Sequence, residues 1–188
     1  MAQSTGYQPM DGRVILITGG ARRIGAALSR GLHAAGARVI VHCRNSTDEA
    51  TALCAELETR REDSAAWLRA DLLQEDAASG LVREAAERFG RLDALINNAS
   101  TFYPTPVGSI TESDWDDLVG TNLKAPVFLC QAAAPFLAES GGSILNLVDI
   151  HARRPIRDHA VYCAAKAGLV ALTQALAKDL GPEIRVNA

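Results

Sequence analysis

The chain of 188 residues has few aromatic side chains, no large excess of positive or negative charge, and no long apolar runs. The chain has 19 lysine and arginine residues and 22 aspartate and glutamate residues, which gives a net charge of −3. It therefore lacks the excess of basic residues that is typical of nucleic-acid-binding proteins. The longest apolar runs are far shorter than the roughly 20 residues that span a bilayer. Residues 1–12 are polar, lack the apolar stretch of a signal peptide, and are expected to form a flexible leader. We therefore expect a cytoplasmic protein without nucleic-acid or membrane partners.

Cysteine is also rare. The four thiols, Cys43, Cys54, Cys130 and Cys163, show no CxxC spacing and lie within apolar or helical patterns. Such cysteines are typical of reduced, packed side chains in the cytoplasm rather than of a disulfide framework or a metal centre. We expect no metal site.

The sequence does contain a regular alternation of short β-branched runs and longer helical stretches. The short runs lie at residues 13–18, 37–43, 65–70, 92–99, 142–149 and 184–188. Helices are expected near residues 24–35, 47–60, 74–90, 112–137 and 160–180. Near-continuous apolar strands are buried on both faces, which predicts an α/β fold, a Rossmann-like doubly wound parallel sheet in three α/β/α layers. Residues 13–188 then form one domain. Because the sequence stops inside the sixth strand, we expect a C-terminal substrate-lid region to be missing from it.

The segment ITGGARRIGAALSRGL follows the first strand and opens the first helix. Gly19 and Gly25 permit a tight turn and a close backbone approach, which lets a pyrophosphate lie on the helix N-terminus. Arg23 occupies the middle glycine position of the usual fingerprint and could instead reach a phosphate directly. A plain strand–helix turn is the alternative, since glycines at such a place are a weak signal alone.

The end of the second strand favours NADPH over NADH. An NAD site places an aspartate or glutamate about 20 residues past the glycines, where it binds the ribose hydroxyls. Here the sequence reads VHCRNS with no carboxylate before Asp48, and Arg44, Asn45 and Ser46 are donors that suit a 2′-phosphate. For Arg44, a solvated loop charge is the alternative.

Further polar residues follow the third and fourth strands. Asp71 can accept a hydrogen bond from the exocyclic amine of an adenine. Asn97 and Asn98 stand where the backbone comes close to a ribose. All three lie at the carboxyl ends of strands, which is where open α/β sheets bind ligands.

A tyrosine and a lysine share one face of the last predicted helix. Tyr162 and Lys166 are spaced i, i+4, and a nearby ammonium lowers the pKa of a tyrosine from about 10, which makes it a usable proton donor. Asn122 lies mid-helix, where a buried amide needs a partner. We expect it to hold a water or a backbone carbonyl in a proton path. For the pair taken alone, an ordinary helix surface is the alternative.

The motifs TGGARRIG, NNAS, Asn122 and YCAAK, in this order and spacing, resemble the short-chain dehydrogenase/reductase superfamily over essentially the whole chain. That superfamily normally has a serine three residues past the asparagine of the fifth strand. Here Asn146 is followed at that offset by Asp149. Together with GGARRIG, VHCRNS and NNASTFYPTP, this aspartate makes the chain similar to the pteridine reductase subfamily.

The resemblance implies roles for the matched residues. Tyr162 is the expected proton donor, Lys166 binds the nicotinamide ribose and lowers the pKa of Tyr162, and Asp149 assists proton delivery to a pterin ring nitrogen. The implied NADPH site comprises Gly19, Arg23, Ile24, Gly25, His42, Arg44, Asn45, Ser46, Asp71, Leu72, Asn98, Ala99, Ser100, Tyr162 and Lys166.

The implied substrate site comprises Arg23, Ser100, Phe102, Asp149 and Tyr162. Phe102 stacks on the pterin opposite the nicotinamide, Ser100 hydrogen-bonds near the substrate and the cofactor phosphates, and Arg23 contacts the pyrophosphate and the substrate. An aromatic ring such as Phe102 supplies a stacking face for a flat substrate. Alternatively, Phe102 and Tyr103 plug their loop onto the core.

The segment AAKAGLVALTQALAKDL is apolar around more of its circumference than a one-sided sheet contact requires. The resemblance implies that the helices at 112–137 and 160–180 pack against other subunits, as in a homotetramer.

The leading hypothesis is an NADPH-dependent reductase that converts dihydrobiopterin, dihydromonapterin or dihydrofolate to the tetrahydro form. A general short-chain carbonyl or 3-oxoacyl reductase is the alternative. Asp149 discriminates between them, because a carboxylate repels a developing oxyanion unless it is protonated. A non-catalytic NADP-binding protein is a third reading, against which the intact Tyr162, Lys166 and Asn122 argue.

Overall fold

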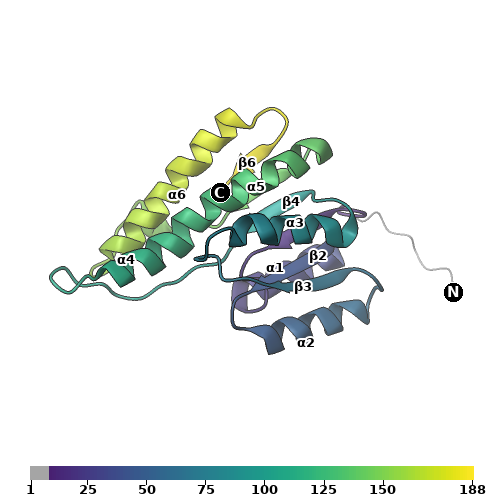
Figure 1. Ribbon diagram of the computed structural model, residues 1–188, viewed down its shortest axis with the longest axis horizontal. Helices are drawn as coiled ribbons and strands as arrows, with labels where there is room; N and C mark the ends of the chain where they lie inside the picture. The colour runs from purple at the N-terminus through teal and green to yellow at the C-terminus, as the bar shows by residue number, and fades with distance from the viewer. Residues whose placement is uncertain (1–8) are drawn as a thin grey trace.

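The computed structural model describes residues 9–188 and arranges six strands in one parallel sheet (Figure 1). The strands are β1 (Val14–Ile17), β2 (Arg38–Cys43), β3 (Ala65–Arg69), β4 (Ala94–Asn97), β5 (Ser143–Asn146) and β6 (Arg185–Asn187). Their order across the sheet is β3-β2-β1-β4-β5-β6, so the winding reverses between β1 and β4. Open α/β sheets bind ligands at such a switch point. The predicted Rossmann-like doubly wound fold is confirmed.

Helices cover both faces of this sheet (Figure 1). One face carries α1 (Arg23–Ala34) and α2 (Thr47–Glu58). The other carries α3 (Ala77–Phe89), α5 (Ala125–Ser140) and α6 (Ala160–Asp179), while α4 (Glu112–Val119) precedes α5 and extends beyond the sheet. The layers are therefore α/β/α.

Strand residues alternate between two separate cores. Leu16 and Leu95 are fully buried in the core that contains α3 and α5. Their sequence neighbours Ile17 and Ile96 lie in the core that contains α1 and α2. Burial on both faces explains why these strands read as unbroken apolar runs. The residues of the candidate site follow the carboxyl ends of these buried strands.

The helix expected as one run over 112–137 is interrupted, which corrects that prediction. A π-helical turn, Gly120–Lys124 (η1), separates α4 from α5, and α5 continues to Ser140. Asn122 lies inside this turn and is buried. A π turn re-aims side chains by one inserted residue and often marks a functional site. The apolar periodicity of the sequence does not reveal a single inserted residue.

Helix α6 is the one described helix with the length and composition of a membrane-crossing helix, with a mean hydropathy of 1.4 over its most apolar window. The helix contains no unbroken apolar run of that length, because polar residues such as Tyr162 and Lys166 interrupt it. Both of these side chains, with Thr173, are buried in the protein. The absence of a membrane partner stays a prediction.

Residues 1–8 of the predicted leader, which spans residues 1–12, lie outside the described residues. Of its remainder, the Met10 amide donates to the carbonyl oxygen of Ala35 at 3.0 Å. The end of this segment is thus tied to the C-terminal end of α1.

Candidate active site

The turn between β1 and α1 is closed so tightly that two of its positions require glycine. A Cβ atom on Gly25 would lie 2.1 Å from the carbonyl oxygen of Gly19. Gly19 has a φ of +60°, and a Cβ atom there would lie 3.0 Å from the Cα atom of Ala99. The backbone of the turn can therefore approach a ligand at the start of α1, as the spacing of the glycines predicts.

Arg23 stands where the usual fingerprint has its middle glycine, and its backbone still adopts the conformation of a glycine. Its φ is +50°, in the left-handed region, although it is the first residue of α1. A non-glycine residue there stores strain of order 1–3 kcal/mol, which is typical of ligand-binding turns. Its side chain is exposed. The arginine is thus placed at the helix N-terminus, where the sequence predicts a pyrophosphate.

His42 lies beneath the glycine turn, and both of its ring nitrogens are hydrogen-bonded to the backbone. The Gly19 amide donates to Nδ1 at 3.2 Å, so Nε2 carries the proton and donates to the carbonyl oxygen of Ala70 at 3.1 Å. Burial lowers the pKa of His42, and only 2% of the residue is exposed. The neutral imidazole therefore holds the turn in place and has no free donor for a phosphate.

The glycine turn is also fixed from the side of β4. The Thr18 hydroxyl oxygen accepts from the amides of Asn98 and Ala99, each at 3.0 Å. The Asn98 side chain donates to the carbonyl oxygens of Thr18 at 2.8 Å and Gly19 at 3.0 Å. Asn98 and Ala99 thus join the ends of β1 and β4 across the switch point of the sheet.

A cavity of about 310 Å³ opens at the end of β2. It is lined by Gly19, Ala21, Arg22, Cys43, Arg44, Asn45 and Ser46. Arg44, Asn45 and Ser46 are brought together as predicted. Arg22 was missed, although the RR pair of the turn was a signal for it. A neighbouring cavity of about 160 Å³ contains His42, Asp71, Leu72, Ala99 and Ser100 together with Gly19 and Arg44. The two cavities could hold an adenosine and its phosphate.

At the other end of the sheet edge, three polar side chains meet between β5 and α6. The Tyr162 hydroxyl donates to a carboxylate oxygen of Asp149 at 2.7 Å. The Lys166 ammonium donates to the carbonyl oxygen of Leu147 at 2.8 Å and lies 5.9 Å from the centre of the Tyr162 ring. Tyr162 and Lys166 are both 4% exposed, because α6 turns this face toward the sheet.

The electrostatics of this group correct the expected effect of Lys166 on Tyr162. Burial, together with the adjacent Asp149 carboxylate, raises the pKa of Tyr162 rather than lowering it. Partial burial disfavours the charge on Asp149, but hydrogen bonds from the His151 amide and the Tyr162 hydroxyl outweigh it and hold the pKa of Asp149 below its usual range. Burial lowers the pKa of Lys166 to about 8. At neutral pH the proton therefore sits on Tyr162, beside an ionised Asp149 and a charged Lys166.

Asn122 holds backbone carbonyls, as expected, and these belong to the helix before it and to the loop after β4. Its amide nitrogen donates to the carbonyl oxygens of Leu118 and Thr101, each at 2.9 Å, and its oxygen accepts from the Ser100 hydroxyl at 2.7 Å. Among the described residues, no hydrogen bond joins Asn122 to Lys166. The π turn thus aims Asn122 at the loop after β4, which it holds next to Tyr162.

Phe102 extends from this loop over Tyr162. Its ring centre lies 4.8 Å from that of Tyr162, with the two planes at 78°. Phe102 is 54% exposed, so it does not plug the core, whereas its neighbour Tyr103 is partly buried and packs against a core cluster. The His159 imidazole stacks on Phe102, with ring centres 4.5 Å apart and planes at 16°. The sequence alone indicated no role for this histidine.

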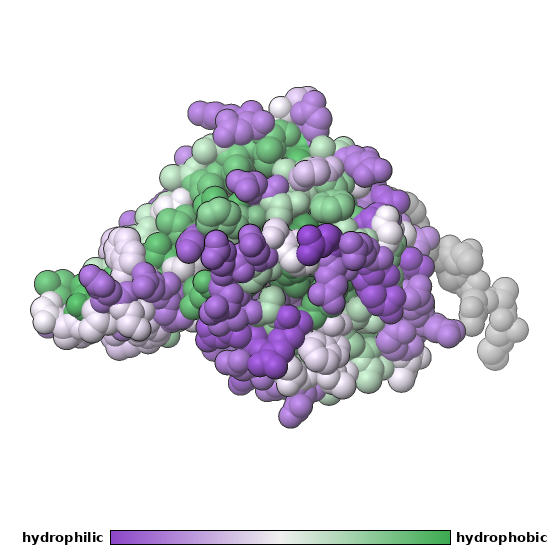
Figure 2. Space-filling view, viewed as in Figure 1, coloured by the Kyte–Doolittle hydropathy of each residue, from purple (hydrophilic) through white to green (hydrophobic). Residues whose placement is uncertain are grey.

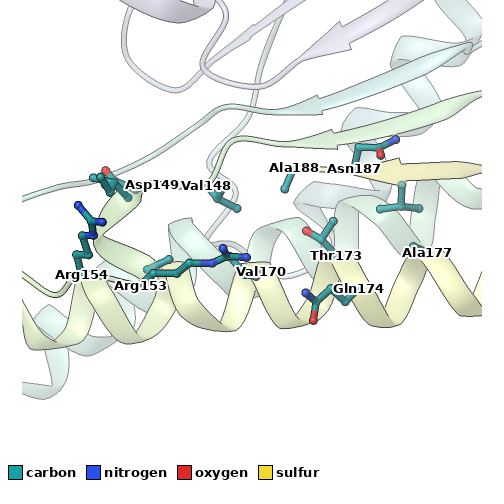
Figure 3. A pocket seen from close by; sticks show the side chains of 13 residues that line it. Val148, Asp149, Arg153, Arg154, Val170, Thr173, Gln174, Ala177, Asn187 and Ala188 are labelled. Carbon is teal, nitrogen blue, oxygen red and sulfur yellow. The ribbon is translucent and has the colours of Figure 1, made fainter.

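A cavity of about 580 Å³ begins at Asp149 and runs along α6 to β6 (Figure 3). Two arginines of the loop after β5 line it. The side chain of Arg153 extends along α6, and that of Arg154 rises next to Asp149. This loop therefore borders the cavity that begins at Asp149.

Residues 9–188 contain no group of three or more His, Cys, Asp or Glu side chains that could hold a metal ion. The four cysteines are buried and free, and burial raises the pKa of Cys54 and of Cys130 to about 12.

Comparison with known proteins identifies a family and several relatives to which this chain is similar. Residues 13–188 match the short chain dehydrogenase family. "Probable galactose dehydrogenase GalD" of Rhizobium meliloti (strain 1021) is 34% identical, over 98% of this chain and 73% of that protein. Pteridine reductase 1 of Leishmania tarentolae is also 34% identical, over 93% of this chain and 74% of its own length. A solved structure from Sinorhizobium meliloti 1021, named for a short-chain alcohol dehydrogenase, superposes with a TM-score of 0.90 and 36% identity, over 95% of this chain and 71% of that one.

Proposed function

Since the chain belongs to the short-chain dehydrogenase family and is an oxidoreductase of that family, we propose that it is an NADPH-dependent pterin reductase. Its substrates are dihydropterins such as dihydrobiopterin, dihydromonapterin or dihydrofolate, which it reduces to the tetrahydro forms. Two relatives of equal identity are named for a sugar and for a pterin substrate, so sequence identity does not indicate the substrate. The choice between substrates therefore rests on the geometry of the site.

One observation carries the proposal, the 2.7 Å hydrogen bond from the Tyr162 hydroxyl to the Asp149 carboxylate. An ionised carboxylate accepts hydrogen bonds, and the edge of a pterin offers N–H and NH₂ donors. A ketone offers only an oxygen that becomes more negative during reduction, and an adjacent carboxylate opposes that change. The pair of Tyr162 and Asp149 therefore suits a substrate that presents nitrogen.

The residues of the chain supply the proton and its control. When bound, the nicotinamide provides the hydride that adds to the carbon of the C=N bond. Tyr162 gives the proton to the nitrogen of that bond, which completes the conversion of C=N to CH–NH. The charged Lys166 offsets the negative charge left on Tyr162 and Asp149, since an opposite charge nearby favours the deprotonated form. Bulk water then restores the proton.

Preference for NADPH rests on the cavity at the end of β2. Arg22, Arg44, Asn45 and Ser46 line it and no carboxylate does. Guanidinium groups recognise phosphate oxygens with charge-assisted hydrogen bonds. An NAD site would instead place a carboxylate there for the ribose hydroxyls.

We further propose that the chain assembles as a homotetramer through α4, α5 and α6. Figure 2 shows apolar surface over α5 and α6, whereas the surface over α3 is mostly polar. Trp115 of α4 is 52% exposed and Phe128 of α5 is 47% exposed. Side chains of this size at a surface are typical of subunit contacts.

The direct test is a substrate panel with purified protein. Loss of nicotinamide absorbance is followed with NADPH or NADH, and with dihydrobiopterin, dihydrofolate or a simple ketone. We expect turnover of a dihydropterin with NADPH. Turnover of the ketone alone would show a carbonyl reductase instead, and a preference for NADH would remove the cofactor assignment.

A further inference from the structure

The residue that begins the catalytic helix breaks a local rule. His159 is the N-cap of α6, a position where Ser, Thr, Asp or Asn normally accepts a backbone hydrogen bond. Its side chain makes no capping hydrogen bond. A residue that violates local preference without a local gain is expected to serve another purpose.

The imidazole of His159 is instead committed to Phe102. The two rings are stacked, with centres 4.5 Å apart and planes at 16°. Nδ1 of His159 donates to the carbonyl oxygen of Arg157 at 2.7 Å, which fixes the orientation of the imidazole. The imidazole thus covers one face of Phe102, and 54% of that residue remains exposed.

The loops that carry the two rings are also joined through their backbones. The Thr105 amide donates to the carbonyl oxygen of Asp158, and Thr105 pairs with His159 in a short parallel bridge. Phe102 precedes this bridge by three residues and Tyr162 follows it by three. The stacked rings therefore hold the position of Phe102 relative to the Tyr162 hydroxyl.

We propose that His159 is a positioning residue, which braces Phe102 as a stacking platform for a flat heteroaromatic substrate. His159 touches neither the substrate nor the reacting atoms. It keeps Phe102 from rotating away, so that a pterin-type ring binds the uncovered part of Phe102 with its edge next to Tyr162 and Asp149. This inference rests on the proposed function, of which it specifies the shape of the substrate.

The effect is expected in substrate binding rather than in the chemical step. An aromatic pair contributes a modest affinity beyond its buried area, equivalent to about a 3- to 10-fold change in KM. His159→Ala should raise the KM for dihydrobiopterin by that factor and leave kcat within about 2-fold. His159→Phe retains the stack and should restore the KM.

Two controls separate positioning from a general structural defect. Arg157→Ala changes the same loop at an exposed side chain that forms an ion pair with its neighbour Asp158, and it should leave both constants unchanged. The KM for NADPH, whose nicotinamide is expected on the face of the pterin opposite Phe102, should not change in His159→Ala. A fall in kcat with every substrate, or no rescue by His159→Phe, would overturn the proposal.

A measurement without turnover tests the stack itself. In ¹H NMR spectra, the imidazole protons of His159 should be shifted upfield by the ring current of Phe102 and return toward random-coil positions in Phe102→Leu. Unshifted protons would overturn the inference. If the stack is present but no pterin is reduced, the proposed function fails by itself. The KM comparison is then made with an aryl ketone, whose KM should still rise in His159→Ala, and an unchanged value would overturn the inference.

Discussion

At the nucleotide end of the sheet, backbone geometry makes the site, whereas at the catalytic end the identity of side chains makes it. Gly25 leaves no room for a Cβ atom, and His42 holds the amide of Gly19 while having no free donor of its own. By contrast, Tyr162, Asp149 and Lys166 form a partly buried group in which each pKa is displaced. Both ends lie on one rigid edge, yet they are sensitive to different changes. The nucleotide end is sensitive to added side-chain atoms in the glycine turn, and the catalytic end is sensitive to changes in side-chain charge.

This difference explains why relatives that differ in substrate share one fold. A turn built from backbone holds any dinucleotide in the same place. Replacing a single side chain beside Tyr162 changes which atom of a substrate can receive the proton. The catalytic end is therefore where the functional change from sugar to pterin is expected to reside.

The largest effect is expected from removing the proton donor. Tyr162→Phe keeps the ring that packs against Phe102 but removes the hydroxyl. We expect kcat to fall by about 10²- to 10⁴-fold, the usual contribution of a general acid. Binding of NADPH, measured by fluorescence titration, should remain within a few-fold of the wild type. An unimpaired rate would show that the proton comes from elsewhere.

The next effect concerns stability and pH. Burial lowers the pKa of Lys166 to about 8, compared with about 10.4 in an unfolded chain. Between these values the unfolded state binds more protons, so this group makes stability rise with pH from about 8 to about 10.4, by about 3 kcal/mol. Lys166→Met removes the titration. Its stability relative to the wild type should therefore fall by that amount over the same pH range in urea unfolding. A pH-independent difference would contradict the assignment.

At the nucleotide end, the corresponding test is one methyl group. Gly25→Ala forces a Cβ atom against the carbonyl oxygen of Gly19, and we expect a loss of about 1–3 kcal/mol together with weaker NADPH binding. Gly31→Ala is the matched control in the same helix, because no atom lies within 4 Å of its added Cβ. That variant should be stabilised by about 0.5–1 kcal/mol. Equal thermal stabilities for the two variants would break the comparison.

The smallest effect is expected in the choice of cofactor. Arg44→Ala removes a guanidinium from the cavity at the end of β2, and the KM for NADPH should rise about 10-fold while that for NADH changes little. Arg60→Ala serves as the control, since Arg60 pairs with Glu56 and does not line the cavity. If the two cofactors were affected equally, Arg44 would not bind a 2′-phosphate.

The fold and the shared face of Tyr162 and Lys166 could be predicted from the sequence, because alternating apolar runs and i, i+4 spacing are local signals. A role for Asp149 followed only from the family resemblance. Sequence reasoning missed the π turn at Asn122, since one inserted residue leaves the apolar pattern nearly intact. It also reversed the pKa shift of Tyr162. The sequence places Lys166 one turn away on the same helix, but only the structure brings Asp149 within 2.7 Å of the hydroxyl. The stack of His159 on Phe102 joins two loops, so no local pattern could predict it.

The central claim is that the Asp149 carboxylate selects a pterin over a carbonyl substrate. Its most direct test is the ratio of kcat/KM for dihydrobiopterin to that for a ketone, measured in the wild type and in Asp149→Ser. Serine removes the charge, lowers the pKa of Tyr162 and offers a hydroxyl to a developing oxyanion. We predict that the ratio falls by about 10²-fold or more, with pterin turnover lost and ketone turnover gained. An unchanged ratio would contradict the account.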